Sequence, residues 1–395
     1  MKRTNYIIRR IFLIVIGLCG LLPSKAEEME PVHYMDSVEF SLITCSPHDE
    51  VYSLYGHSAL RYHDLHQDTQ EDIVFNWGVF NYNKPFFVLR FVFGLTDYEL
   101  GIADFQPFCK FYQRWGCSVT EQVLNLTTEE KERLKSALAD NYRPENRVYR
   151  YNYFYDNCST RPRDMIERCV SGKVIYYPRE DFEPSFRRMV SQKTAQYPWA
   201  TFGNDMLLGV KSDLKTNRKE QEFLPENLLY DFDHAQIKCN DGMLKPLVKE
   251  RRIAVQSGIQ FIEPGFPLTP LACGLILLAL SLIVFAFEWK RRKTYKYWDV
   301  MLMLLTGLAG CVLFVMIFSQ HPTTTLNLQL LLINPVHLFY IPTIWKRRKS
   351  RYWQVLVGMV LLFMIGSIFQ HFAEGVIFLA LCLLIRYWSH VRNEK

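Results

Sequence analysis

The sequence lacks the cysteine patterns that mark a zinc site or a disulfide scaffold. Its 10 cysteines include no pair separated by two residues, and their spacing does not repeat. Metal-binding and disulfide-rich modules depend on such patterns, so neither class is indicated. A strong charge imbalance is also absent, because the net charge is only +6 over 395 residues. We therefore expect no nucleic-acid partner, no metal and no cofactor.

Many of the basic residues that are present lie near long apolar runs, which points to membrane topology. Five apolar segments follow the first 267 residues: Leu268–Trp289, Trp298–Phe318, Leu326–Trp345, Trp353–Phe372 and Val376–Trp388. The third is interrupted by prolines and the fifth is short, so a count of four spans stays open.

Lysine and arginine lie in alternate connections between these segments. Basic clusters follow the first segment (290–293) and the third (346–351), whereas the connections 320–327 and 370–375 have none. Cytoplasmic connections carry the excess of positive charge in membrane proteins. With five spans, the first 267 residues therefore lie outside the cytoplasm.

Residues 1–26 have the composition of an export signal. Basic residues precede the apolar run Ile11–Leu22, and a small-residue exit ends at Ala26. The run is short for a membrane span and favours cleavage after Ala26, with an uncleaved N-terminal anchor as the alternative. Cys19 follows the bulky Leu18, which disfavours lipidation of that cysteine.

Cys158 lies where two secondary-structure patterns meet. The aromatic run Val148–Tyr155 predicts a strand, and Ser159–Cys169 predicts a helix. At a helix N-terminus, backbone N–H groups and the helix dipole stabilise a thiolate, which is the reactive form of cysteine. Cys158 is therefore a candidate nucleophile, although a single cysteine at a helix start is more often a small buried hydrophobic residue.

A base for this cysteine is expected from two strands near the N-terminus. The segments on both sides of the polar turn 63–71 alternate between polar and apolar residues, as strands do. If they pair as an antiparallel hairpin about the middle of that turn, His57 falls opposite residues 76–78. That register places the Asn76 amide beside the imidazole.

Cys158, His57 and Asn76 together have the residue types needed for acyl transfer through a thioester. The reaction requires a cysteine nucleophile, a histidine base and a polar group that orients the imidazole. The histidine comes first in this chain, which is a circular permutation of the papain order. Geometry and roles define such a site, so the order does not count against it.

Other residues near these positions leave alternatives open. The backbone N–H of Cys158 is the standard contributor to an oxyanion hole. Asn157, Ser159 and Arg161 are further oxyanion or orienting candidates, although Arg161 can also pair with Asp164 or hold the loop. Rival nucleophiles and bases are Cys45, Cys169, His48 and His63.

The stretch Pro85–Gly94 is strongly apolar and contains one charge. It predicts a buried strand or helix, and the alternative is a wall for a lipid chain or an edge that dips into the membrane. On that alternative, Phe87 and Phe91 are candidate substrate contacts, together with Trp77 from the preceding strand.

Several short runs resemble the Lnb-type proteins of Bacteroides-like bacteria. These runs are residues 55–61, 75–78, 93–98, 157–161, 320–322 and 332–335. Lnb-type proteins are described as lipoprotein N-acyltransferases. Their periplasmic domain is similar to the permuted NlpC/P60 group that includes the lecithin:retinol acyltransferase-like enzymes.

The resemblance implies that Cys158 takes an acyl chain from a phospholipid and passes it to the α-amine of a diacylglyceryl-cysteine on a lipoprotein. His57 would be the base, and Asn76 stands where retinol-type relatives use a second histidine. The implied partners are a phospholipid donor, a lipoprotein acceptor and membrane lipids, at the inner membrane. The alternatives are a cysteine hydrolase with the same dyad, acting on cell-wall peptides or phospholipids, and a non-enzymatic membrane scaffold.

We therefore expect an α+β protein with four parts. Residues 1–26 are the signal, and residues 27–178 form a permuted papain-like (NlpC/P60-type) periplasmic domain. Residues 179–267 form a periplasmic extension, which we expect to be helical, and residues 268–395 form an all-α transmembrane bundle of about five helices.

Overall fold

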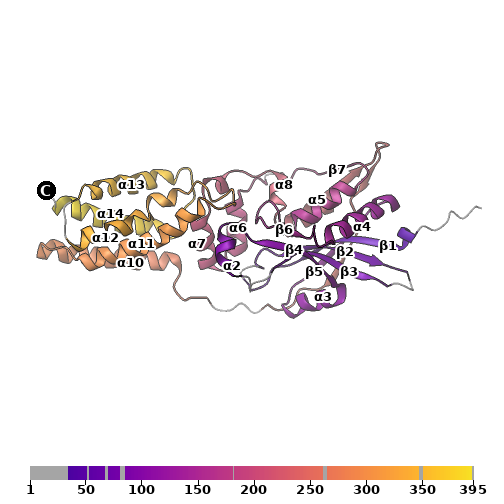
Figure 1. Cartoon of the computed structure of the whole chain (residues 1–395), viewed down its shortest axis with the longest axis horizontal. Coiled ribbons are helices and arrows are strands. Elements are labelled where there is room, and N and C mark those ends of the chain that lie inside the picture. Colours follow the sequence, from indigo (N-terminus) through magenta and orange to yellow (C-terminus); the bar gives the residue numbers. More distant parts are fainter. Residues whose placement is uncertain are drawn as a thin grey trace, which may run out of the picture. The chain divides into compact units, whose positions relative to one another are not determined.

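The structure is a computed structural model that describes residues 34–50, 53–66, 70–80, 85–180, 182–260, 265–346 and 350–393. The chain divides into two compact units, Met1–Ser37 and Val38–Lys395. Of the first unit only the 3-10 helix η1, Tyr34–Ser37, is described, and the predicted signal peptide lies outside the described residues. All the other elements belong to the second unit (Figure 1).

A seven-stranded antiparallel sheet is the framework of the N-terminal part. Its strand order is β10-β5-β1-β2-β3-β4-β6. The strands are β1 Val38–Cys45, β2 His57–Asp64, β3 Asp72–Val79, β4 Asp97–Asp104, β5 Val119–Leu124, β6 Val148–Arg150 and β10 Val248–Val255. The predicted strands on both sides of the polar turn are thus confirmed as β2 and β3.

The edge strand β10 differs from the helical extension that we expected between residues 179 and 267. Val248–Val255 pairs with β5 and completes the main sheet. Arg252 of this strand forms an ion pair with Glu39 at 2.7 Å. A largely polar edge strand has little apolar alternation, which is why the sequence did not predict it.

Helices cover both faces of the sheet (Figure 1). On one face lie α4, Thr128–Tyr142, and α5, Thr160–Cys169, and on the other lies α3, Phe105–Arg114. The Thr127 side chain accepts a hydrogen bond from the Glu130 backbone, and the Glu130 carboxylate accepts one from the Thr127 backbone. These two reciprocal hydrogen bonds form a capping box, which fixes the start of α4.

The extension combines short helices with a small antiparallel sheet. Its helices are α6 Phe186–Thr194, α7 Pro198–Leu207, η2 Val210–Asp213, α8 Arg218–Gln221 and α9 Pro225–His234. The small sheet has the order β7-β8-β9. Its first strand, β7 Lys173–Ile175, precedes the extension, whereas β8 Gln236–Lys238 and β9 Leu244–Pro246 belong to it. Phe186 and Phe223 pack against Phe154, so the extension supports the segment that leads to Cys158.

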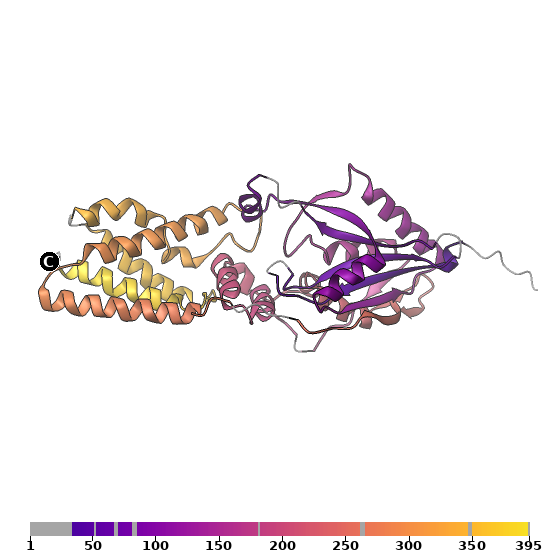
Figure 2. The same cartoon turned by 90° about the horizontal axis from the view of Figure 1, so that it is seen from below.

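Five described helices form the C-terminal part and run side by side in both views (Figure 1, Figure 2). They are α10 Pro270–Arg291, α11 Lys296–Met316, α12 Val336–Trp345, α13 Tyr352–Gly366 and α14 Val376–Asn393, with the 3-10 helix η3 Leu328–Leu331 before α12. Three stretches are long and apolar enough to cross a membrane, namely Pro270–Arg291, Lys296–Met316 and Leu328–Trp345. The mixed α/β part followed by a helical part is confirmed, and the count of five spans stays a prediction.

The apolar stretch Pro85–Gly94 forms the short helix α2, Phe87–Val92. Contrary to our expectation, this stretch is not buried. Phe86 is 76% exposed, Leu89 54% and Phe91 38%. The expectation of a buried element is therefore wrong. Apolar composition alone does not tell whether a helix faces the core or the surroundings of the protein.

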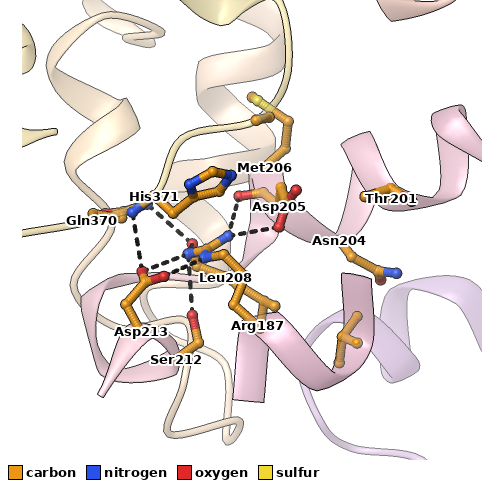
Figure 3. Close-up of polar contacts among 12 residues, drawn as sticks. Arg187, Thr201, Asn204, Asp205, Met206, Leu208, Ser212, Asp213, Gln370 and His371 are labelled. Carbon is orange, nitrogen blue, oxygen red and sulfur yellow. Dashed lines mark hydrogen bonds and ion pairs between the residues drawn. The ribbon is translucent and has the colours of Figure 1, made fainter. Parts of the chain in front are cut away.

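A buried cation connects the extension to the C-terminal helices. Arg187 of α6 forms ion pairs with Asp205 of α7 at 3.1 Å and with Asp213 of η2 at 2.8 Å. Asp213 also accepts a hydrogen bond from the backbone N–H of His371, in the loop before α14 (Figure 3). One guanidinium thus orders two segments of the extension and, through Asp213, a loop of the helical part.

Replacing Arg187 by alanine should lower the free energy of unfolding by about 3–5 kcal/mol, because two acidic side chains would lose their buried partner. Thermal unfolding of the purified full-length protein in detergent measures this effect. Arg188 is the next residue on α6 and is exposed. Arg188→Ala is therefore the matched control, with an expected change of no more than about 0.5 kcal/mol. Equal stability of the two variants would contradict a stabilising role for the Arg187 cluster.

Candidate active site

The turn that carries Cys158 is held by the side chain of Asn157. Its Oδ1 accepts hydrogen bonds from the backbone N–H groups of Ser159 at 2.9 Å and Thr160 at 3.0 Å. Its Nδ2 donates to two backbone carbonyl oxygens. Because both amide hydrogens are used in this way, Asn157 orients the turn and has no N–H left for an oxyanion hole. The helix α5 begins at Thr160, two residues after Cys158.

The register of β2 and β3 brings His57 to Asn76. Leu60 of β2 pairs with Phe75 of β3, and His57 and Asn76 lie beyond this pair on the two strands. His57 Nε2 lies 2.7 Å from Asn76 Oδ1. An amide oxygen only accepts hydrogen bonds, so Nε2 carries the proton of the neutral ring and Nδ1 remains to exchange a proton with a thiol.

Gly78 marks the point where the three predicted site residues meet. A Cβ atom on this glycine would lie 3.5 Å from His57 Cε1, 4.0 Å from Asn76 Oδ1 and 4.0 Å from Cys158 Cβ. The backbone φ angle of +135° also favours glycine. Gly78 was not among the predicted site residues. A glycine inside a strand pattern is nevertheless a signal that other groups approach the backbone closely.

The pKa values of Cys158 and His57 shift in the directions that favour charge on both. Burial raises the pKa of the Cys158 thiol, but the charge of His57 and its hydrogen bond lower it more, so that the pKa is lowered overall. Burial lowers the pKa of His57, but the charge of Cys158 and the hydrogen bonds to Cys158 and Asn76 raise it overall. Each group stabilises the charged form of the other, as in a thiolate–imidazolium pair.

Two serines fasten β2 to the start of α5 beside the thiol. The hydroxyl oxygens of Ser58 and Ser159 lie 3.0 Å apart, and both residues are fully buried. The backbone N–H of Ser58 and the side chain of Ser159 also help to lower the pKa of Cys158. Its contacts with Ser58 and Cys158 are those expected if Ser159 orients the thiol. Ser58 was missed, because only the pairing of distant segments brings its backbone to the thiol.

The rival cysteines have thiols that ionise less readily. Burial raises the pKa of Cys45 well above its ordinary value, and it raises the pKa of Cys109 to about 11. Burial also raises the pKa of Cys169, which is the last residue of α5, where the helix dipole disfavours a thiolate. Neither Cys45 nor Cys169 is therefore favoured as a nucleophile.

The rival bases, His48 and His63, have neighbours other than Cys158. The ring of His48 stacks on Trp115 with centroids 4.6 Å apart, and burial lowers its pKa. His63 lies near the other end of β2, opposite Asp72 of β3 and Glu39 of β1. Across the described ranges, no group of three or more His, Cys, Asp or Glu residues is placed to hold a metal ion.

Arg161 contacts the segment before Cys158 through Asp156 and Tyr149. Its Nε and Nη2 donate hydrogen bonds to the Asp156 carboxylate at 2.6 and 2.8 Å. Its guanidinium carbon lies 3.6 Å from the centre of the Tyr149 ring. Asp164 forms an ion pair with Arg163 at 2.8 Å. The contacts of Arg161 therefore fit an orienting residue more closely than an oxyanion donor.

Trp77 does not lie at the thiol. It occupies the opposite face of β3 from Asn76, is fully buried, and donates its indole N–H to Asn141 Oδ1 at 3.0 Å. It lines an open groove of about 1130 Å³ between α4 and α5, whose lining includes neither His57 nor Cys158. We therefore assign Trp77 to the core beneath α4 and withdraw it as a substrate contact.

The other two predicted substrate contacts lie on α2. The rings of Phe87 and Phe91 stack with centroids 6.5 Å apart. They belong to an exposed apolar helix and not to the group of side chains around Gly78.

Two family comparisons cover most of the chain. Residues 32–189 match the Lnb N-terminal periplasmic domain, and residues 262–395 match the Lnb transmembrane domain. The chain belongs to the Lnb-type family. A search of curated proteins and a search of solved structures each returned no significant match.

Membership of the Lnb-type family confirms the resemblance that the short runs indicated. It indicates a membrane enzyme that modifies lipoproteins, with its N-terminal domain in the periplasm. The relation of this domain to the NlpC/P60 group stays a prediction.

The Cys158 thiol of this Lnb-type protein should ionise below pH 9.0, the ordinary value from which its pKa is lowered. Thiolates react with iodoacetamide, so the alkylation rate at Cys158, followed by mass spectrometry, should reach half its plateau below that pH. In His57→Gln the midpoint should move to higher pH, because the imidazolium no longer stabilises the thiolate. Cys109, whose pKa is raised to about 11, serves as the internal control. An unchanged midpoint in His57→Gln would contradict the pairing.

Proposed function

We propose that this protein transfers an acyl chain from a phospholipid to the α-amine of the diacylglyceryl-cysteine of lipoproteins, through a thioester on Cys158. The observation that carries the proposal is the convergence of Cys158, His57 and Asn76 around Gly78, with a lowered thiol pKa. This group occurs in the periplasmic domain of a chain whose family modifies lipoproteins at a membrane.

In the first half-reaction the Cys158 thiolate attacks the ester carbonyl carbon of the phospholipid. The carbon–sulfur bond forms, and the bond from that carbon to the glycerol oxygen breaks. The His57 imidazolium gives its proton to the departing oxygen, so that a lysophospholipid leaves and the acyl chain stays on the enzyme as a thioester. A raised His57 pKa favours the protonated ring that this step consumes.

In the second half-reaction the α-amine of the lipoprotein cysteine attacks the thioester. His57 is now neutral and takes the proton that the amine loses as the amide bond forms. The carbon–sulfur bond breaks, and Cys158 leaves as a thiolate beside the imidazolium. The pair returns to its starting charges, which the mutual stabilisation of the two groups favours.

The neighbours of the pair have orienting roles in this mechanism. Asn76 accepts from His57 Nε2 and so directs Nδ1 toward the thiol. Asn157 and Arg161 fix the turn on which Cys158 stands. The oxyanion of each tetrahedral intermediate requires N–H donors, and we assign the Cys158 backbone N–H to that role.

The attachment of the domain to a helical membrane part supports lipid substrates. Both the phospholipid donor and the lipidated acceptor are confined to a bilayer surface. A catalytic domain held at that surface meets them at a high effective concentration without binding either tightly in solution. A wall peptidase needs no more than one anchor, so the multi-helix part favours the acyltransferase over that alternative.

Cells that depend on Cys158→Ser or His57→Gln should accumulate lipoproteins with a free α-amine, because the nucleophile or the base is missing. Mass spectrometry of lipoprotein N-terminal peptides measures the N-acylated fraction. Cys239 is a partly buried cysteine of the extension, so Cys239→Ser is the matched control and should keep wild-type acylation. Full acylation in Cys158→Ser cells would rule out the thioester mechanism.

The same cells distinguish the alternatives. Release of free fatty acid without N-acylation by the wild type would instead indicate a phospholipase, and accumulation of cleaved wall peptides would indicate a peptidase. If neither appears and acylation is normal without the protein, a scaffold role would remain.

Asn76→Ala should lower the transfer rate by about tenfold, because the hydrogen bond that orients the imidazole is lost. The hydrogen bond to Asn76 also raises the pKa of His57, so its loss should lower that pKa. Activity falls at alkaline pH when His57 loses its proton, and the alkaline limb of the pH–rate profile should therefore move to lower pH. A loss of activity with an unmoved profile would indicate that Asn76 serves only the fold.

A further inference from the structure

The helix α2 exposes an apolar surface that no described segment covers. Phe86 is 76% exposed, Leu89 54% and Phe91 38%, although all three come from one short stretch of the chain. Exposed apolar side chains of this size, close together, mark a contact with another molecule or with lipid. Two features of the structure identify which of these it is.

The first feature is the attachment of α2 to the end of a membrane helix. The backbone N–H of Gln320 donates to Phe93 O at 3.0 Å, and His321 Nε2 lies 3.3 Å from Phe91 O. A Cβ on Gly94 would come within 3.1 Å of the Gln320 side chain, which shows how closely the two segments approach.

These loop residues follow α11, whose apolar stretch Lys296–Met316 is long enough to cross a membrane. Gln320 is four residues beyond that stretch, in the connection 320–327 that has no lysine or arginine. The polar interfacial layer of a bilayer begins where such a helix leaves the hydrocarbon. The position of α2 beside this loop therefore places its exposed side chains at the boundary between lipid chains and headgroups.

The second feature is a row of stacked aromatic rings that runs from α2 toward the nucleophile. Phe91 stacks on Phe87 at 6.5 Å, and Phe87 stacks on Phe80 at 5.6 Å between centroids. Phe80 stacks on Tyr98 at 4.9 Å, and Tyr98 stacks on Tyr151 at 4.1 Å.

Tyr151 belongs to the aromatic run that leads to Cys158, seven residues before it in the chain. Burial, then the charges of Tyr98 and Cys158, raise the pKa of the Tyr151 hydroxyl well above its ordinary value. The row thus connects the membrane boundary with the neighbourhood of the thiol.

We propose that α2 inserts Phe86 and Leu89 into the outer leaflet of the membrane, and that the ring row from Phe91 to Tyr151 guides the acyl chain of the phospholipid donor to Cys158. The proposal rests on the acyl transfer proposed above. It deepens that function by naming the surface through which the lipid enters. The flat faces of these rings suit an alkyl chain, because they offer it a large apolar contact area.

Photo-crosslinking tests the surface without requiring activity. Full-length Cys158→Ser protein, with a benzophenone amino acid replacing Leu89, is placed in vesicles of phosphatidylethanolamine and phosphatidylglycerol whose acyl chains carry an alkyne. Irradiation should attach alkyne-tagged lipid to position 89. The same amino acid at Tyr177, which is 48% exposed just before the extension, is the control. We expect about tenfold more adduct at position 89, because its side chain is transferred to lipid.

A second position separates the two parts of the proposal. The benzophenone at position 87 should also capture the lipid, because the acyl chain passes along the rings. Adduct at 89 without adduct at 87 would overturn the acyl path, and equal adduct at 89 and 177 would overturn the membrane contact. Since all the proteins in this experiment carry Cys158→Ser, these outcomes do not depend on whether the thioester mechanism is correct.

A kinetic measurement on the active enzyme completes the test. Leu89→Asn should raise the KM for the phospholipid donor by about tenfold and leave kcat nearly unchanged, because it weakens lipid entry and not the chemistry. Leu65 directly follows β2, at the end of the strand away from His57, and is 51% exposed. Leu65→Asn is therefore the matched control, and its kinetics should be unchanged. An unchanged KM in Leu89→Asn would contradict lipid entry at α2.

Discussion

The antiparallel register between β2 and β3 is the constraint on which the candidate site depends. It pairs Leu60 with Phe75, and the His57 imidazole then meets the Asn76 amide. A slip of one residue would turn His57 to the other face, because side chains alternate along a strand. The buried residues Ala59 and Leu60 lie on opposite faces and resist such a slip, since it would exchange their surroundings.

The candidate nucleophile, Cys158, stands on a turn that packs on the extension. The ring of Phe154 lies 4.4 Å from that of Phe186 and 5.0 Å from that of Phe223, measured between centroids. Phe186 begins α6, and the next residue, Arg187, is the buried cation tied through Asp213 to the loop before α14. Packed contacts therefore connect the cysteine turn with the ends of the membrane helices.

Sequence patterns failed where burial depends on distant parts of the chain. The stretch around α2 has a core-like composition, yet its side chains are exposed beside the loop after α11. Trp77 has the size and position of a substrate contact, yet β3 turns it toward α4. The strand β10 is polar and finds its place only through pairing with β5. In each case the same residues are compatible with more than one environment.

The sequence by itself determined the features that depend on local patterns. Alternation predicted β2 and β3 and their register, a change of pattern predicted the start of α5 after Cys158, and short runs indicated the Lnb-type family. Only the tertiary structure decided which thiol has a lowered pKa, because charge and burial come from groups far apart in the chain. It also decided that Asn157 uses both amide hydrogens, one of them on Phe223 O of the extension, and that Ser58 supports the thiol. Hydrogen bonds and desolvation depend on what surrounds a residue in space, and a linear pattern does not contain that information.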